Sequence, residues 1–256
     1  MQLISQKLHR DLPPTQLYGY GGMSPGPTIE TRPGVPVLAE FPNELPSMHI
    51  LPVDESVCDE SPKGRAVVHL HGGSQEWSSD GSAYAWFEPG YSAVGPYWRS
   101  PIYTWANTVQ KSMLWYHDHS DCITRLNVYA GLAGLYILRG PREAGLPPRE
   151  REMPLVLMDR CLYPNGSLVY PGDPDGDVPI SIVPEFFGNI SLVNGIVWPR
   201  MTVAPTTYRF RILDASNARF YNLRLYEQDN ATGLPNTTLP GPGERSPTLT
   251  GGGGLG

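Results

Sequence analysis

Short apolar runs, separated by turn residues, alternate with polar positions along most of the chain. The clearest alternation places Tyr208, Phe210 and Ile212 on one face of a strand, because successive strand side chains point to opposite faces. Arg209 and Arg211 fall on the other face, which we expect to be solvated. Six further runs have the composition of strands, at residues 35–41, 65–71, 112–117, 134–140, 153–159 and 190–195. Strands at this spacing, without helical periodicity between them, predict an all-β sandwich or barrel.

A polar, proline-rich stretch divides these strands into two groups. Residues 141–152 are predicted to link a first domain over 1–140 to a second over 153–226. The second group has fewer strands than a complete sandwich needs, so part of its core and a sheet edge are expected to be uncovered. Residues 227–256 are rich in glycine, proline and threonine and poor in apolar residues, which predicts a disordered tail.

Composition and charge exclude two classes of partner. The net charge is −6 without any basic block, which argues against a nucleic-acid surface. No apolar run is long enough to cross a membrane. The first residues lack the apolar stretch of a secretory signal, whereas four N-glycosylation sequons favour a secretory route. The sequons begin at Asn165, Asn189, Asn230 and Asn236.

The three cysteines are too few and too scattered to indicate a disulfide framework. Cys58, Cys122 and Cys161 show no CxxC spacing. We expect three ordinary thiols, with a single disulfide as the alternative.

Two histidine pairs are the strongest chemical signal. Of six histidines, four form His-x-His motifs, His69 with His71 and His117 with His119. Residues two apart on a strand share a face, about 7 Å apart, so two such strands can bring four imidazoles into one small volume. Imidazole suits copper, zinc, iron and nickel, so the spacing predicts a metal site without identifying the metal.

Other polar residues receive simpler interpretations. His9 and His49 stand alone in the sequence and are not expected to bind metal. Asp173, Asp175 and Asp177 have part of the spacing of a calcium loop, but the required later glutamate is absent, so we expect no calcium site.

Motifs around the paired histidines resemble the multicopper oxidases. They are HLHGG, LWYHDH, ITRLNVYAGLAGLYILRG and YRFRILDASNARFYNLRL, and the resemblance extends over roughly residues 8–226. The branch with spore-coat laccases, bilirubin oxidases and phenoxazinone synthases, which includes plant ferroxidase-like members, is the most similar. The resemblance implies cupredoxin-like Greek-key sandwiches, here one complete domain and an incomplete second one. It also implies oxidation of a substrate at a type 1 copper and reduction of dioxygen to water at a trinuclear copper cluster.

The resemblance assigns roles to the paired histidines. Eight histidines hold the cluster in the family, and by motif His69 corresponds to a type 2 copper ligand. His71, His117 and His119 correspond to ligands of the type 3 copper pair.

Asp80 matches an acidic residue near the cluster in these relatives. A carboxyl group there could relay protons to reduced oxygen, which is a general acid–base role. A turn-forming aspartate before Gly81 is an equally weighted interpretation.

The chain carries only half of the expected copper ligands. It has no histidine after His119 and no cysteine flanked by histidines, and the family's last domain supplies the other four cluster ligands and the type 1 site. Cys122 lies where glycine is more typical of these relatives, and is not the type 1 cysteine. We therefore expect the chain to be inactive alone. The reductant of the whole protein would be a phenol, a tetrapyrrole pigment or Fe(II).

Three interpretations of this half-site remain open. In the first, the chain is a truncated or alternatively spliced form, or an incomplete gene model, of a laccase-like oxidase. In the second, it is a non-catalytic copper-binding module, or a subunit that completes its site with a separate C-terminal cupredoxin domain. In the third, the four histidines form a hydrolytic zinc site with one open position for water.

Overall fold

The computed structural model describes residues 1–58, 61–141, 145–171, 183 and 185–226. The chain divides into two compact units, Met1–Phe220 and Tyr221–Gly256, and each is considered by itself. In the second unit, residues 221–226 are described and form no helix or strand. The predicted disordered tail, the aspartates of the rejected calcium loop and two of the sequons lie outside the described residues.

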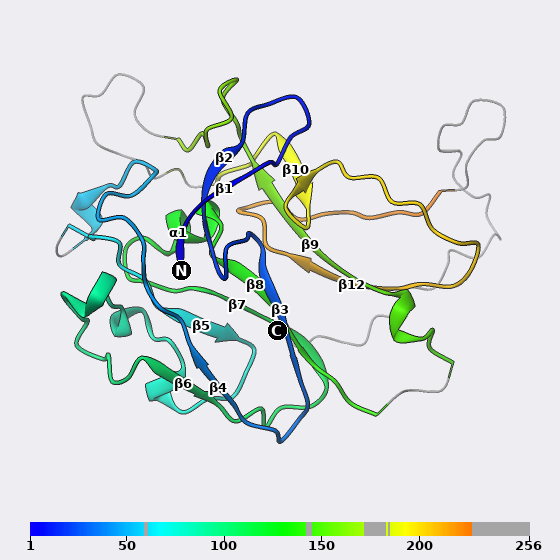
Figure 1. Cartoon of the computed structure of the whole chain (residues 1–256), viewed down its shortest axis with the longest axis horizontal. Coiled ribbons are helices and arrows are strands. Elements are labelled where there is room, and N and C mark those ends of the chain that lie inside the picture. Colours follow the sequence, from blue (N-terminus) through cyan, green and yellow to red (C-terminus); the bar gives the residue numbers. More distant parts are fainter. Residues whose placement is uncertain (59–60, 142–144, 172–182, 184, 227–256) are drawn as a thin grey trace. The chain divides into compact units, whose positions relative to one another are not determined.

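The first half of the chain forms two facing sheets and a hairpin (Figure 1). The larger sheet has the strand order β3-β8-β7-β5, in which β3 and β8 are parallel and the other neighbours antiparallel. These strands are β3 (Gly26–Thr31), β5 (Val68–His71), β7 (Ser112–Asp118) and β8 (Ala133–Leu138). A second sheet pairs β4 (Val37–Glu40) with β6 (Ile102–Trp105), and the hairpin pairs β1 (Gln2–Gln6) with β2 (Thr15–Gly19).

Aromatic side chains fill the space between the two facing sheets. Trp105 of β6 packs edge-on against Tyr136 of β8, with ring centroids 5.4 Å apart. Phe41, just after β4, contacts Tyr116 of β7 at 5.9 Å. Trp105, Tyr116 and Tyr136 are essentially buried, and burying side chains of this size contributes roughly 2–3 kcal/mol each. This core makes the first half a β-sandwich.

A third sheet holds the second half of the described chain. Its order is β11-β10-β9-β12, with the long strand β9 between β10 and β12 in Figure 1. The strands are β9 (Glu152–Arg160), β10 (Ile190–Val193), β11 (Ile196–Val197) and β12 (Arg209–Asp214), and β12 runs parallel to β9.

Helical structure in the described residues is limited to short segments. The α-helix α1 covers Thr124–Ala130. The 3-10 turns are η1 (Glu55–Val57), η2 (Trp77–Ser79), η3 (Ala83–Ala85), η4 (Pro89–Tyr91) and η5 (Arg149–Arg151). None of these helices is both long and apolar enough to span a bilayer. Every predicted strand overlaps an observed one, and the all-β sandwich prediction is confirmed, whereas α1 was not predicted.

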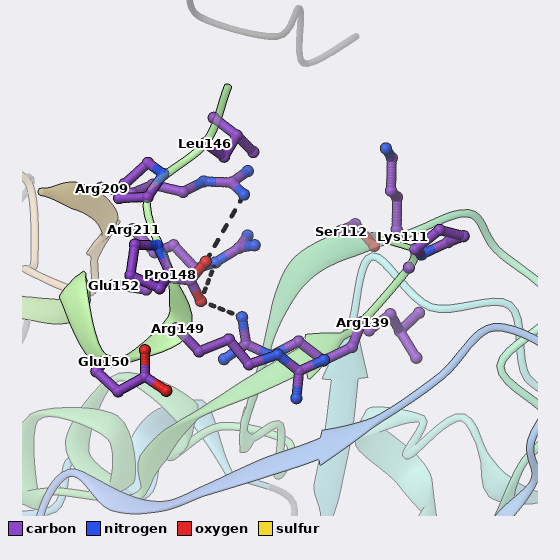
Figure 2. Close-up of a pocket in the computed structure, with 14 residues that line it drawn as sticks. Lys111, Ser112, Arg139, Leu146, Pro148, Arg149, Glu150, Glu152, Arg209 and Arg211 are labelled. Atoms are coloured by element: carbon purple, nitrogen blue, oxygen red, sulfur yellow. Dashed lines mark hydrogen bonds and ion pairs between the residues drawn. The ribbon is translucent and has the colours of Figure 1, made fainter. Parts of the chain in front are cut away.

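The prediction for the two faces of β12 is wrong. Its arginines are not a solvated face, because Arg211 Nε lies 2.8 Å from Glu152 Oε1 and Arg209 Nη1 lies 3.6 Å from Glu152 Oε2. Figure 2 shows these two ion pairs beside a third from Arg139 to the same carboxylate. The apolar side chains of the strand are instead exposed, by 45% for Phe210 and 40% for Ile212. Parallel pairing with β9, which begins at Glu152, turns the arginine face toward a carboxylate that local alternation cannot reveal.

Candidate metal centre

Antiparallel pairing of β5 with β7 brings the two His-x-His motifs together. The register places His69 opposite His117 and His71 opposite Trp115. Beyond the end of β7, the His119 backbone N–H donates to the carbonyl of Val67 at 3.0 Å, which extends the pairing by one more residue. Since residues two apart share a strand face, all four imidazoles gather on one side of this strand pair. Leu70, between the first two histidines, points the other way and is 1% exposed.

The four imidazole rings form a compact cluster. The ring centroid of His69 lies 5.5 Å from that of His71, 5.6 Å from His117 and 5.0 Å from His119. The His117 centroid lies 5.4 Å from His71 and 5.9 Å from His119. The structure thus brings together all four histidines that the sequence nominated.

Two ring nitrogens are placed as a pair. His71 Nδ1 and His117 Nε2 are 3.2 Å apart. Two nitrogens bound tetrahedrally to one ion through bonds of about 2.0 Å lie about 3.3 Å apart. Across the described residues, no group of three or more His, Cys, Asp or Glu side chains converges on a common metal position. The cluster therefore offers a two-nitrogen pair and two further single donors.

Backbone carbonyls orient two of the rings. His69 Nδ1–H donates to the carbonyl of Asp80, and His117 Nδ1–H donates to the carbonyl of Asp118 at 2.7 Å. A carbonyl only accepts, so both rings carry their proton on Nδ1 and keep Nε2 as the lone-pair nitrogen. The His119 ring is partly buried, and a backbone hydrogen bond with Gly81 raises its pKa against the effect of burial.

Burial favours the neutral form of three of the four imidazoles, those of His71, His117 and His119. Burial, followed by the neighbouring histidines, lowers the pKa of His117 to about 4. Burial also lowers the pKa of His71 and His119, and His69 adds to both shifts. The neutral ring is the form that binds a metal ion, so these three rings can bind one at neutral pH without first releasing a proton.

Trp115 covers one side of the cluster. Its ring stacks on His71 with centroids 5.4 Å apart, and it lies tilted against His117 with centroids 4.1 Å apart. The indole therefore limits ring rotation of the two histidines whose nitrogens are paired.

Asp118 joins the two histidine-bearing segments and was not nominated from the sequence. Its side chain is fully buried, and Oδ1 accepts from the Val67 N–H at 3.0 Å and from Ser120 Oγ at 2.9 Å. Oδ2 accepts from the Ser120 N–H at 3.0 Å, and the carboxylate also accepts from the Asn127 side chain. Burial raises its pKa to about 6, against these hydrogen bonds. The sequence signal for this role is an aspartate between two histidines, which alternation places on the strand face opposite to theirs.

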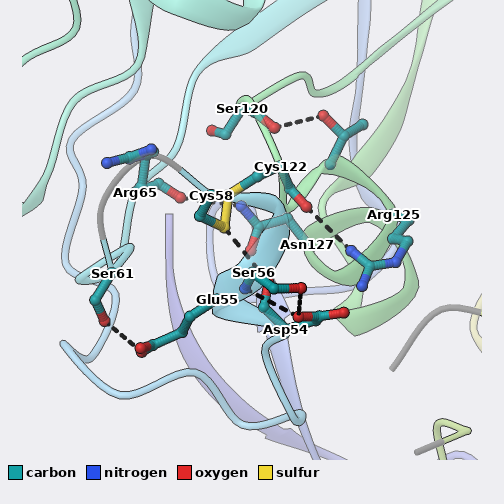
Figure 3. Close-up of a disulfide and its surroundings, with 11 residues drawn as sticks. Asp54, Glu55, Ser56, Cys58, Ser61, Arg65, Ser120, Cys122, Arg125 and Asn127 are labelled. Carbon is teal, nitrogen blue, oxygen red and sulfur yellow. Dashed lines mark hydrogen bonds between the residues drawn. A yellow bond between two sulfur atoms is a disulfide. The ribbon is translucent and has the colours of Figure 1, made fainter. Parts of the chain in front are cut away.

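A disulfide lies three residues beyond His119 (Figure 3). Cys58 and Cys122 are bonded, so the expectation of three thiols is wrong for these two, while Cys161 is a free thiol. The two cysteines are 64 residues apart in sequence with Cα atoms 5.3 Å apart, a proximity that only the fold creates. Cys122 has a φ of 61°, a left-handed conformation that glycine adopts most easily. In Figure 3 Arg125 reaches back to the Cys122 carbonyl, at 3.0 Å.

The remaining nominated residues lie in different settings. Asp80 is close to the cluster, with Oδ1 3.6 Å from His69 Nδ1 and its side chain 45% exposed. His49 forms a hydrogen bond with Asn127 at 3.0 Å, and His9 packs edge-on against Trp198. Neither of these two belongs to the ring cluster, and their exclusion as ligands stays a prediction.

Comparison with known proteins gives a consistent result. No protein-family model matches the chain. The sequence is 46% identical to a laccase of Bacillus subtilis over 236 residues, which is 88% of this chain and 46% of that protein. It is 43% identical to the multicopper oxidase LPR1 of Arabidopsis thaliana, over 84% of this chain and 39% of that protein. The chain spans about half the length, or less, of these curated relatives.

A solved structure supports the same relationship. A multi-copper oxidase from Pediococcus acidilactici superposes with a TM-score of 0.60 and 25% identity, covering 84% of this chain and 40% of that one. The cupredoxin-like form of the predicted sandwich is thereby confirmed. With this identity, and with two His-x-His motifs on paired strands, the chain belongs to the multicopper oxidase family and corresponds to the N-terminal portion of its members.

Proposed function

We propose that the chain binds copper through His69, His71, His117 and His119 and supplies half of the ligands of a trinuclear cluster. The observation that carries the proposal is the 3.2 Å separation of His71 Nδ1 from His117 Nε2 on paired strands. In this proposal these two histidines share one type 3 copper. His119 binds the other type 3 copper, and His69 binds the type 2 copper.

The tautomers explain how this pair would accept an ion. Because His117 carries its proton on Nδ1, its Nε2 accepts, and His71 Nδ1 donates the hydrogen bond between them. Binding one copper to both nitrogens requires His71 to hold its proton on Nε2 instead. When bound, copper supplies one-electron redox chemistry toward dioxygen. The carbonyls of Asp80 and Asp118 hold the neighbouring rings in the tautomer that leaves Nε2 available.

Asp80 is proposed as a proton relay to the oxygen-reducing site. Its carboxylate is partly exposed and 3.6 Å from His69 Nδ1, so it touches both solvent and the cluster. The turn-forming role remains open as well, because Asp80 also follows the 3-10 turn η2. Replacing Asp80 with Asn keeps the turn and removes the proton exchange. In the whole protein, where oxygen would be reduced, the pH dependence of oxygen reduction therefore separates the two roles.

The remaining ligands are proposed to come from a C-terminal cupredoxin domain. A cluster of eight histidines needs four more than the two His-x-His pairs supply, and the type 1 site needs a cysteine beside histidines. In the whole protein, oxidation of a phenol, a tetrapyrrole or Fe(II) would be coupled to reduction of dioxygen to water. The chain alone is expected to bind copper without turnover.

A non-catalytic copper-binding module is the second candidate. The pairwise arrangement of donors favours it over a hydrolytic zinc site, because catalytic zinc takes three protein ligands on one ion. No such set converges in the described part of the chain.

Copper competition against a chelator tests the proposal. We expect His71→Ala combined with His117→Ala to weaken copper binding by roughly tenfold or more. The control His9→Ala should leave the affinity unchanged. Equal copper affinity in the paired variant and the parent would refute the assignment. Intense blue-copper absorption by the isolated chain would refute the half-site.

A further inference from the structure

A strongly charged hollow lies at the opposite end of β7 from the histidines. Ser112, the first residue of β7, lines it, whereas His117 is five residues further along, about 17 Å of strand. The hollow has a volume of about 400 Å³, within the range of small-ligand sites. Its charged lining residues are Lys111, Arg139, Arg149, Arg209, Arg211, Glu150 and Glu152.

One carboxylate is shared by three guanidinium groups in this hollow. The side chain of Glu152 is 8% exposed and pairs with Arg139, with Arg211 at 2.8 Å and with Arg209 at 3.6 Å. Burial opposes its ionisation, but hydrogen bonds from Arg211 and Arg139 outweigh burial and lower its pKa. Glu152 is therefore an anion at neutral pH, and its charge is divided among three cations.

A second carboxylate reduces the excess of positive charge without removing it. Glu30 pairs with Arg139 at 2.6 Å. Three arginines thus share two carboxylates, while Arg149 and Lys111 add two cations to the lining and Glu150 adds one anion. The side chains of Arg139 and Arg211 are only 13% and 16% exposed, so water compensates them weakly.

The cationic groups face the hollow from different sides (Figure 2). Arg209 and Arg211 extend from β12 on one side, and Lys111 stands with Ser112 on the other. Arg139 lies below them at the end of β8, and Leu146 forms an apolar edge. A ligand in this position would contact guanidinium groups from β12 and from Arg139, which directly follows β8 of a different sheet.

We propose that this pocket binds a small oxyanion with two or more negative charges, of the phosphate or polyphosphate class. Guanidinium groups present planar forks of donors that match the oxygens of a phosphate group, and each such pair is charge-assisted. Several acceptor oxygens on one ligand can satisfy arginines that now compete for Glu152. The site is independent of copper, since it shares no residue with the histidine cluster.

Calorimetric titration of pyrophosphate into the full 256-residue chain tests the site. At a constant ionic strength of about 0.1 M, exposed charges are screened beyond roughly 10 Å, which suppresses non-specific attraction. We expect saturable binding of one ligand per chain. Arg149→Gln and Arg209→Gln should each weaken it by roughly three- to tenfold.

The control variant removes the same charge elsewhere. Arg10→Gln alters a side chain that is 89% exposed and pairs only locally with Asp11, so pyrophosphate affinity should be unchanged. Absence of saturable binding, or equal weakening by Arg10→Gln, would overturn the proposal.

Two further measurements test the ligand class and separate loss of binding from loss of folding. Parallel titration of citrate separates a phosphate site from a polycarboxylate site, and tighter binding of citrate would overturn the assigned ligand class. Thermal unfolding of each variant with and without pyrophosphate reports binding even where a variant is destabilised, because a ligand of the folded state raises Tm. A pyrophosphate-induced Tm increase that persists undiminished in Arg149→Gln/Arg209→Gln would also contradict the assignment.

Discussion

Replacing Asp118 with Asn tests how the two histidine-bearing segments are held together. Asp118 Oδ1 accepts from the Val67 N–H and from Ser120 Oγ, and Oδ2 accepts from the Ser120 N–H. An asparagine keeps one acceptor oxygen, but its amide group then faces a buried N–H donor. Leaving a buried donor unsatisfied costs roughly 1–3 kcal/mol, and the inserted NH₂ adds a second such group. We therefore expect Asp118→Asn to lower the free energy of unfolding by about 2–4 kcal/mol.

Thermal unfolding of the copper-free chain measures this loss directly. For a folded region of about 150–250 residues, 1 kcal/mol shifts Tm by roughly 2–4 °C, so a decrease of about 5–15 °C is expected. Copper affinity should fall roughly tenfold or more, because His117 and His119 flank Asp118 and its hydrogen bonds set their position. Asp11→Asn is the control, since this carboxylate is 60% exposed.

Two results would refute this account of Asp118. A Tm within about 1 °C of the parent would mean that the carboxylate stabilises neither segment, since exposed substitutions stay within roughly 0.5 kcal/mol. A large loss of stability with unchanged copper affinity would mean that Asp118 supports the fold without positioning the histidines.

Three further predictions follow from the same structure. Replacing both Cys58 and Cys122 with Ser should lower the free energy of unfolding by about 4 kcal/mol, from the chain-entropy relation for a 64-residue separation. Dithiothreitol should lower the Tm of the parent but not that of this variant. Burial lowers the pKa of His49 from 6.5 to about 4 in the folded chain. The unfolded chain therefore binds this proton at a higher pH than the folded chain, and stability is lost as pH falls from 6.5 to 4. His49→Gln should flatten this part of the stability–pH curve, and an unchanged curve would contradict the assignment. Gly81→Ala should destabilise the chain, because φ at this position is +73° and the new Cβ would lie 2.0 Å from the Val68 carbonyl oxygen. Copper binding should weaken as well, because Val68 directly precedes His69. A variant with the Tm of the parent would contradict this prediction.

Much of the candidate site could be predicted because its pattern is local. Alternation with a period of two places His69 and His71 on one strand face, whatever the rest of the chain does. The same alternation places His117 and His119 on one face, although β7 itself ends at Asp118 between them. Strand positions could be predicted for the same reason, since apolar runs between turn residues carry the signal. The helix α1 was missed because seven residues are too few to establish a helical period.

The tertiary structure decided which of these local features meet. Only the antiparallel register of β5 with β7 places His71 Nδ1 within 3.2 Å of His117 Nε2, and no local pattern encodes that register. The Cys58–Cys122 disulfide likewise depends on a contact across 64 residues.

Charge placement shows the same division between sequence and structure. Alternation correctly put Arg209 and Arg211 on one face of a strand, but their partner is decided by the parallel pairing of β12 with β9. That pairing brings them to Glu152 and leaves Phe210 and Ile212 exposed. A strand's own sequence determines which side chains share a face, because backbone geometry is local. Which face is buried, and against what charge, depends on neighbouring strands that are distant along the chain, so only the folded structure determines it.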